Sequence, residues 1–420
     1  MILSTLSPEA ELLLLTAGSA PVAGSDGSDG SDESDGSRAS NSLGARRIRE
    51  LLRGELDWEK LGWLAERERA APVLWGQLQA IESVPGMLPP QAAHLQRLAM
   101  VSEFRMMHLE QRLARSLEAL SDADIDVMLL KGAALALTVY GSFVRRPMID
   151  VDVLVHEDEA LRAREVLVGE GWVSTEMEEF ESFYRRHHHL PTLVDGRGLD
   201  MQLEVHTGLF FEGNPFDFPM ADLWRRAVPV MVRGRRAYVP SRQDQLLHLC
   251  LHFAWSHMMS TGAWRTFRDL RALMDAGDLN WDEFVALARK SRGASCCYWT
   301  LRLARNLVGV PVPEQVLAAL RPPMTVSMLD RVERHFVFNL LPSEVLCPSV
   351  FMARTMWRVG VRPRWSGHGS VRPWDRNEEL LVGGIRPDSL GRRALNQLRN
   401  VKGWSRYVRT VLLAGSQGRA

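Results

Sequence analysis

The sequence contains little lysine, little cysteine and no long hydrophobic run. Only four of its 51 basic residues are lysines, so arginine carries almost all of the positive charge. Four cysteines cannot cross-link a chain of 420 residues, which favours a reducing, cytoplasmic location. The longest apolar runs, such as Leu12–Leu15 and Val127–Leu130, are far shorter than a membrane-spanning helix. The N-terminus lacks a basic region and carries Glu9 and Glu11, which argues against a signal peptide.

An excess of either charge is also missing. Lysine and arginine together number 51, and so do aspartate and glutamate, so the formal net charge is zero. A neutral chain has no overall field to attract nucleic acid or a membrane surface, and we expect neither as a partner. Hydrophobic residues make up 46% of the chain and charged residues 24%, as in a soluble globular protein. At 420 residues the chain is too long for one core, which predicts two or three domains.

Composition and hydrophobic periodicity divide the chain into parts. Residues 18–44 are rich in glycine, serine and aspartate, and they have too few large apolar groups to offset the entropy of folding. Apolar residues at three- and four-residue steps predict helices on both sides of a central segment with strand-like patterns. The predicted parts are an N-terminal helix (1–17), a disordered loop (18–44), an N-terminal helical region (45–120), a core with a small mixed β-sheet (121–238), a C-terminal helical domain (239–345) and a basic, partly irregular region (346–420). The expected fold is α+β and predominantly helical overall.

Two strand-like segments open the central core. Residues 125–130 form a short, almost continuous apolar run, typical of a strand covered on both faces, and Lys131-Gly132 follows it at the start of a helical pattern. Backbone N–H groups at a glycine turn between a strand and a helix can bind an anion. Residues 148–156 alternate strictly, with four apolar side chains on one face and Asp150 and Asp152 on the other.

The aspartate pair predicts a metal site. Two aspartates at positions i and i+2 of a strand project from the same face, about 7 Å apart at the backbone, so both carboxylates can reach one or two divalent ions. Mg²⁺ prefers oxygen ligands and retains waters, so two carboxylates and substrate phosphates suit it. A lone Asp-x-Asp is more often a solvated polar face. Here the strand is otherwise apolar, and a third carboxylate, Glu204, lies on the polar face of a later predicted strand over residues 199–207.

One stretch of the core resembles a known family. The residues LLKGAALALTVYGSFVRRPMIDVDVLV resemble the uncharacterised nucleotidyltransferase family of the DNA polymerase β superfamily. That family's pattern is an apolar strand, Lys-Gly, a helix that ends near a tyrosine, an arginine and then Asp-x-Asp. The matching residues are Lys131-Gly132, Tyr140, Arg145 or Arg146, and Asp150-x-Asp152. The later HHLPTLVDGRGLDMQLEVHTGL resembles the family's hairpin, with Glu204-Val205-His206 at its end, and the likeness covers most of residues 45–320.

The resemblance implies a nucleotidyltransferase that moves a nucleoside monophosphate from an NTP to a small-molecule or peptide acceptor, with Mg²⁺ or Mn²⁺ and release of pyrophosphate. Members of the family resemble tailoring enzymes of peptide and antibiotic biosynthesis. The catalytic and metal-binding residues that it implies are Asp150, Asp152 and Glu204, and the nucleotide-binding residues are Lys131, Gly132 and Arg146. Two alternatives stay open: a protein-modifying AMP transferase of the toxin or antidote type, and a nucleotide-binding protein without turnover.

The position of the phosphate turn has two candidates. The superfamily usually places Gly-Ser about a dozen residues before Asp-x-Asp. Lys131-Gly132 lies farther upstream than that, and Gly141-Ser142 lies rather close. We favour Gly132 because it follows a predicted strand, with Gly141 as the alternative. In a chain that nearly always uses arginine, Lys131 beside this turn indicates a need for a compact charge.

Histidines form two further groups with metal-binding side chains. His187, His188 and His189 are adjacent, and three consecutive residues of a strand cannot all face one ion, so we expect no metal there. The second group is His248, His252 and His257, in which residues four apart share a helix face, but no acidic third ligand lies in register. Packing or substrate contact is therefore the simpler expectation for them.

Overall fold

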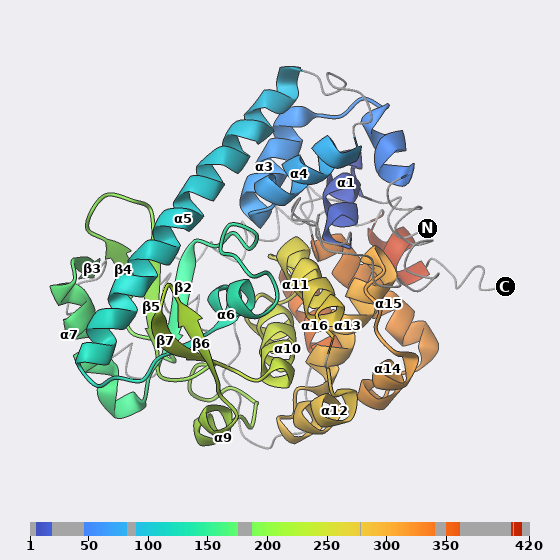
Figure 1. The fold of residues 1–420 in the computed structure, drawn as a ribbon. Helices are drawn as coiled ribbons and strands as arrows, with labels where there is room; N and C mark the ends of the chain where they lie inside the picture. Colours follow the sequence, from blue (N-terminus) through green and yellow to red (C-terminus); the bar gives the residue numbers. More distant parts are fainter. Residues whose placement is uncertain are drawn as a thin grey trace, which may run out of the picture.

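The computed structural model describes residues 6–18, 46–81, 90–174, 187–277, 279–340, 350–361, 405 and 407–413. All but the first residue of the predicted disordered loop (18–44), and most of the basic region (346–420), lie outside the described residues. The expected α+β fold is confirmed, because helices predominate and the strands form a mixed sheet (Figure 1). The six-part division of the chain is kept as a proposal. No helix within the described ranges has both the length and the apolar composition needed to cross a membrane. The cytoplasmic location stays a prediction.

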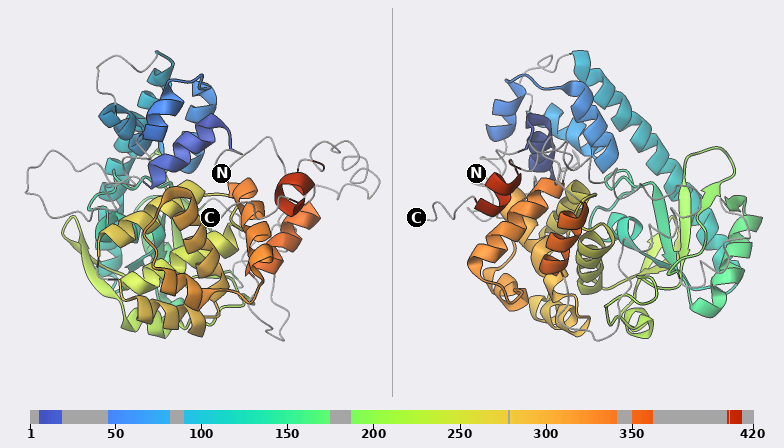
Figure 2. Two further views of the ribbon diagram at one scale, coloured as in Figure 1. Left: turned by 90° about the vertical axis from the view of Figure 1, so that its right-hand side faces the viewer. Right: turned by 180° about the vertical axis from the view of Figure 1, so that it is seen from behind.

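Several helices precede the sheet among the described residues, and two of them begin at side chains that cap them. The helices include α1 (Pro8–Ala17), α3 (Trp58–Glu68), α4 (Ala71–Ile81), the short η2 (Pro90–Ala92) and α5 (Ala93–Asp122). The Ser7 side chain accepts a hydrogen bond from the Ala10 N–H and caps α1. Asp57 caps α3 in the same way by accepting from the Lys60 N–H. The long helix α5 runs along the outside of the molecule from this helical group to the sheet (Figures 1 and 2).

Seven strands form one mixed sheet in the order β3-β4-β5-β2-β1-β7-β6. They are β1 (Met128–Leu129), β2 (Asp150–Leu154), β3 (Trp172–Ser174), β4 (Leu193–Asp195), β5 (Gln202–His206), β6 (Val228–Val232) and β7 (Arg235–Val239). Strand β2 pairs in parallel with β5 and antiparallel with β1, and β1 pairs in parallel with β7. The segments predicted as strands over 125–130, 148–156 and 199–207 contain β1, β2 and β5, each shorter than expected.

The alternation predicted for the central strands is confirmed by their packing. The helices around the sheet are α6 (Lys131–Thr138), η3 (Glu157–Glu159), α7 (Ala160–Gly169) and α9 (Met220–Arg225). Val151, Val153, Leu203 and Val205 are buried in one apolar cluster with leucines of α5 and α7. Because side chains alternate along a strand, the polar residues of β2 and β5 lie on the opposite face.

A helical group follows the sheet in the chain and packs against the N-terminal helices. It consists of α10 (Arg242–Leu251), the π-helical turn η5 (His252–Ser256), α11 (Ala263–Asp275), α12 (Trp281–Lys290), α13 (Ala294–Val308), α14 (Glu314–Leu320), α15 (Val326–Leu340), α16 (Val350–Val361) and η6 (Val408–Leu413). Helix α1 contacts both α11 and α13. The Trp264 Nε1–H donates to the Thr16 Oγ1 at 2.9 Å, across 248 residues of chain. The N-terminal helices and the C-terminal helical group therefore share one apolar core, whose members run from Leu6 to Val361.

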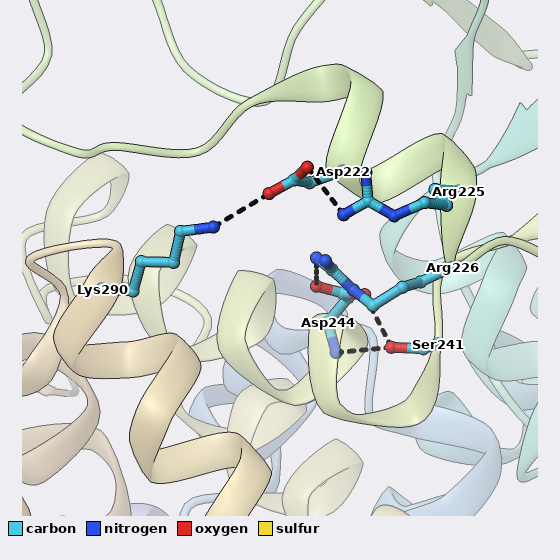
Figure 3. A network of polar contacts seen from close by, with 6 residues as sticks. All are labelled: Asp222, Arg225, Arg226, Ser241, Asp244 and Lys290. Carbon is cyan, nitrogen blue, oxygen red and sulfur yellow. Dashed lines mark hydrogen bonds and ion pairs between the residues drawn. The ribbon is translucent and has the colours of Figure 1, made fainter.

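Ion pairs fix the first helix of this group next to the sheet. Arg226, just after α9, binds the buried Asp244 of α10 through two hydrogen bonds of 2.8 and 2.7 Å (Figure 3). The Ser241 side chain caps α10 and also donates to Asp244 at 2.6 Å. Lys290 at the end of α12 pairs with Asp222 of α9 at 3.0 Å. These contacts set the position of α10, whose side chains form one wall of the site described next.

Candidate active site

The parallel pairing of β2 and β5 brings the predicted carboxylates together. In this register Asp152 lies opposite Glu204, and Asp150 lies opposite Gln202. Asp152, Glu204 and His206 each present a ligand atom within 4.8 Å of the others. Asp150 precedes Asp152 by two residues, so it lies on the same face of β2, and it lines the same cavity.

The cavity above these carboxylates has a volume of about 400 Å³. Residues of α6, β2 and β5 form one side of it, and residues of α10, η5 and α11 form the other. It therefore lies between the sheet and the C-terminal helical group. The residues that line it include Lys131, Gly132, Arg146, Asp150, Asp152, Glu204, His248, His252, His257 and Arg265.

Two cations from within the chain already bind Asp152. The Lys131 Nζ lies 2.7 Å from the Asp152 Oδ1, and the His206 Nε2 lies 2.8 Å from the same oxygen. The His206 Nε2 is also 3.3 Å from the Glu204 Oε2, and its Nδ1 bonds the Gly208 carbonyl at 3.3 Å. Because all three partners are acceptors, both ring nitrogens of His206 must carry protons, so this imidazole is cationic.

The charges in this cluster shift one another's pKa values. Burial alone would raise the pKa of Asp152, but the Lys131 charge and the His206 hydrogen bond outweigh it and hold the pKa well below the usual range. Burial, and then repulsion by Asp152, raise the pKa of Asp150. Burial opposes the charge on His206, yet its bonds to Asp152 and Glu204 raise its pKa. The three carboxylates of β2 and β5 have Lys131 and His206 as their contacting basic side chains, and the repulsion that raises the pKa of Asp150 is one that a bound cation relieves.

Helix α6 begins at Lys131 itself, directly after β1. Lys131 has a positive φ of 45°, and the preceding Leu130 offers no side-chain cap. The first N–H groups of a helix have no intrahelical acceptor, so this uncapped end can bind an anion. Gly132 lines the cavity, whereas Gly141 is exposed at a bend with φ +66°. A Cβ at position 132 would lie 3.4 Å from the Met148 sulfur, an ordinary contact, so the close backbone approach assigned to Gly132 stays a prediction.

Arg146 lines the cavity but is bound to another residue. Its guanidinium donates to both carboxylate oxygens of Asp269 in α11, at 2.6 and 2.7 Å. The Tyr140 hydroxyl donates to the same carboxylate at 2.8 Å, and Asp269 is 1% exposed. Arg146 therefore ties the segment before β2 to the helical group. Its predicted contact with nucleotide stays a prediction.

Three histidines of the helical group line the opposite wall. Burial lowers the pKa of His248 to about 3 and that of His257 to about 4, and it lowers that of His252 well below its usual value. All three are therefore neutral at pH 7. None of the three belongs to a group of described residues with metal-binding geometry, and packing or substrate contact stays the prediction for them. His252 begins the π-helical turn η5 and His257 follows it, and such turns are frequent at functional sites.

The prediction that His187, His188 and His189 cannot all face one ion was wrong. One nitrogen from each lies within 4.8 Å of the others. Residues 187–189 do not form the regular strand that the prediction required. The chain bends at 187 and 188, and His189 forms an isolated bridge with His206. Consecutive side chains alternate between faces only in an extended strand, so a bend can bring three neighbours together.

Buried histidines predict acid sensitivity of the helical group. Burial lowers the pKa of His335 in α15 to about 4, as it lowers that of His248 to about 3. In the unfolded chain these histidines are protonated below about pH 6.5, whereas in the folded chain they are protonated only below their lowered pKa values. Stability is therefore greatest above pH 6.5 and falls as the pH drops toward 4. At pH 5 the loss is on the order of 2 kcal/mol for each histidine.

Urea unfolding at pH 7.5, 6 and 5 measures this loss. The variant His335→Gln should show a shallower fall than the original chain between pH 7.5 and 5, because it has one histidine fewer to protonate on unfolding. Equal slopes for the two proteins would contradict the assignment of His335.

Three residues of this site had no role in the sequence-based prediction. His206 was placed on the same face as Glu204, and its two-residue spacing was the available signal. Asp269 and Arg265 lie on α11, which comes to the site only through the tertiary fold. Helical periodicity shows that such a helix has a buried face, but not which cavity that face borders.

Comparison with known proteins gives one family. The profile of the uncharacterised nucleotidyltransferase family matches residues 54–309, more than half of the chain. Among solved structures, the chain is similar to the antibiotic-resistance factor ANT(2'')-Ia, known from a solution structure, at 12% sequence identity and a TM-score of 0.30. That similarity covers 44% of this chain and 91% of the other, and at this TM-score it says nothing about the acceptor. No curated protein matches.

Proposed function

Because the chain belongs to the uncharacterised nucleotidyltransferase family, we propose that it transfers a nucleoside monophosphate from an NTP to a small-molecule or peptide acceptor and releases pyrophosphate. The observation that carries this proposal is the parallel register of β2 and β5, which sets Asp152 opposite Glu204 at the base of a cavity of about 400 Å³. An NTP and part of an acceptor are of the size that such pockets accommodate.

The donor set fits Mg²⁺ or Mn²⁺. Asp152 and Glu204 offer carboxylate oxygens within 4.8 Å of each other, and Asp150 adds a third carboxylate at the same cavity. Hard cations of this kind prefer oxygen ligands and tolerate open positions for phosphate. Repulsion between Asp150 and Asp152 raises the pKa of Asp150, and a bound cation would relieve it. When bound, the cation supplies charge stabilisation at the α-phosphate and the departing pyrophosphate.

The chain's own residues then have separate tasks. Asp150, Asp152 and Glu204 hold the cation, and Glu204 also accepts the proton of the acceptor hydroxyl as its oxygen attacks the α-phosphorus. The bond from that phosphorus to the bridging oxygen of pyrophosphate breaks, and pyrophosphate leaves with the electron pair. Lys131 and the N–H groups at the start of α6 contact phosphate oxygens. His206 holds Asp152 and Glu204 in place through its two hydrogen bonds.

Pyrophosphate release tests the proposal. The purified chain is incubated with Mg²⁺, each NTP labelled at the α-phosphate, and a cell extract separated into small molecules and protein. We expect pyrophosphate, with label in the small-molecule or peptide fraction, and no product when EDTA is present. Label in the protein fraction would instead support the protein-modifying alternative. Calorimetric binding of Mg·NTP without pyrophosphate from any extract would support a binding protein without turnover.

A further inference from the structure

Three arginine or lysine side chains line the cavity, and one of them differs from the other two. Lys131 pairs with Asp152, and Arg146 pairs with Asp269. Arg265, in the first turn of α11, forms no hydrogen bond and no ion pair within 4 Å with any residue that the structure describes. Its side chain is half-buried and borders the cavity. The guanidinium therefore has its donors available on the cavity side.

The chain before α11 has three residues with left-handed backbone, and the last of them, Gly262, leaves space for Arg265. Met258, Met259 and Gly262 have φ values of 49°, 54° and 72°. Left-handed backbone costs free energy for a non-glycine residue and clusters at functional sites. A Cβ at position 262 would lie 3.3 Å from the Arg265 Nη2, so glycine leaves space for the guanidinium.

None of the described residues places an opposite charge within contact distance of Arg265. The nearby Glu68 is fully buried, accepts from the Trp264 N–H at 3.2 Å and lies beyond ion-pair distance of Arg265. Burial raises the pKa of Glu68, and the charge of Arg265 opposes this rise from beyond contact distance. His252 and His257 on the same wall are neutral, as shown above. Desolvation, and then repulsion by Arg146, lower the pKa of Arg265, although Glu68, Asp150 and Asp269 attract its charge from beyond contact distance.

An unpaired cation in a half-buried site is costly unless a ligand completes it. We propose that Arg265 binds a carboxylate or phosphate of the acceptor, so that the acceptor of the proposed reaction is an anionic molecule. This inference rests on the proposed function, because only a transfer reaction has an acceptor. The choice of acceptor over NTP follows from position: the triphosphate has Lys131, the α6 N-terminus and the carboxylate-bound cation on the sheet side, whereas Arg265 stands on the helical wall. Arginine presents a planar fork that matches both acidic groups.

The test compares Arg265→Gln with the original chain, with succinate and inorganic phosphate as probes. Each probe is titrated into nucleotide-free protein and into protein saturated with Mg²⁺ and a non-hydrolysable NTP analogue. We expect the variant to bind the probes at least about tenfold more weakly, because it loses a charge-assisted, two-pronged contact. Its affinity for the NTP analogue should stay within about twofold. Arg225→Gln, which removes an exposed surface arginine, serves as the charge-matched control and should bind the probes as the original chain does.

Thermal unfolding separates a ligand site from a structural role. Arg265→Gln should leave Tm unchanged or raised, because the side chain has no described partner to lose. Arg146→Gln should lower Tm, since it breaks a bidentate pair with a buried carboxylate. A clear fall of Tm in Arg265→Gln would overturn the proposal.

Two other results would also overturn it. One is unchanged binding of both probes by Arg265→Gln. The other is a loss of affinity for the NTP analogue instead of the probes, which would assign Arg265 to the nucleotide. The nucleotide-free titration does not depend on turnover. If no NTP yields pyrophosphate and yet the probes bind the original chain and not the variant, the anion site stands and the proposed function fails.

Discussion

Asp152→Asn is expected to lower pyrophosphate release by about three orders of magnitude, or ~4 kcal/mol of transition-state stabilisation. Asp152 lies opposite Glu204 in the parallel pair and is the carboxylate that Lys131 and His206 both contact. Asparagine has the same shape, but it lacks the charge needed to hold a divalent cation against phosphate. Initial rates at saturating NTP and Mg²⁺ measure the loss.

Two controls make this result specific. Circular dichroism and Tm should show that the variant is folded, because asparagine can still accept one hydrogen bond in place of the carboxylate. Asp200→Asn removes an exposed aspartate that pairs with Arg105 and does not line the cavity, and it should leave the rate within about twofold of the original. Undiminished activity in a folded Asp152→Asn protein would contradict the assigned metal site.

Asp269→Ala is expected to lower the free energy of unfolding by about 3–5 kcal/mol. Asp269 is buried, accepts both prongs of the Arg146 guanidinium and also accepts from the Tyr140 hydroxyl. Alanine would leave Arg146 without its counter-ion in the interior and the Tyr140 hydroxyl without an acceptor. Urea unfolding at pH 7.5 measures the change.

Helix α11 offers a matched control for that experiment. Asp275 also pairs with an arginine of the helix, Arg271, at 2.8 Å, but its side chain is 31% exposed. Asp275→Ala should therefore cost less, about 1–2 kcal/mol, because the partly exposed carboxylate contributes less and the buried Arg271 keeps its hydrogen bond to the Gly18 carbonyl. Equal losses in the two variants would show that the Arg146 pair does not join α11 to the sheet in the way described.

Local patterns in the sequence were enough to predict the central strands. The strict alternation of residues 148–156 predicted which side chains of β2 face the core, and Val151 and Val153 are buried there. The same alternation put Glu204 on the polar face of β5, and the parallel register places it opposite Asp152. The catalytic and metal-binding roles of these residues stay predictions.

Long-range contacts could not be predicted in this way. The family resemblance assigned Arg146 to the nucleotide, but no local pattern indicated that its guanidinium binds Asp269, which lies 123 residues later. Periodicity identifies a buried helix face but not the distant segment that will cover it. For the same reason no pattern in the sequence indicated that Arg265 would border the cavity. The bend at His187–His189 was missed because its geometry depends on contacts outside the local pattern.

The packing of α1 has a consequence for biosynthesis. Its fully buried Leu12, Leu13 and Leu14 are covered partly by α11 and α13, and Thr16 finds its partner Trp264 only 248 residues later. At translation rates of roughly 5–20 residues per second, this delay is roughly 10–50 s. Throughout that interval the leucines of the emerging chain lack the part of their native cover that α11 and α13 supply, so ribosome-associated chaperones have a long window in which to bind them.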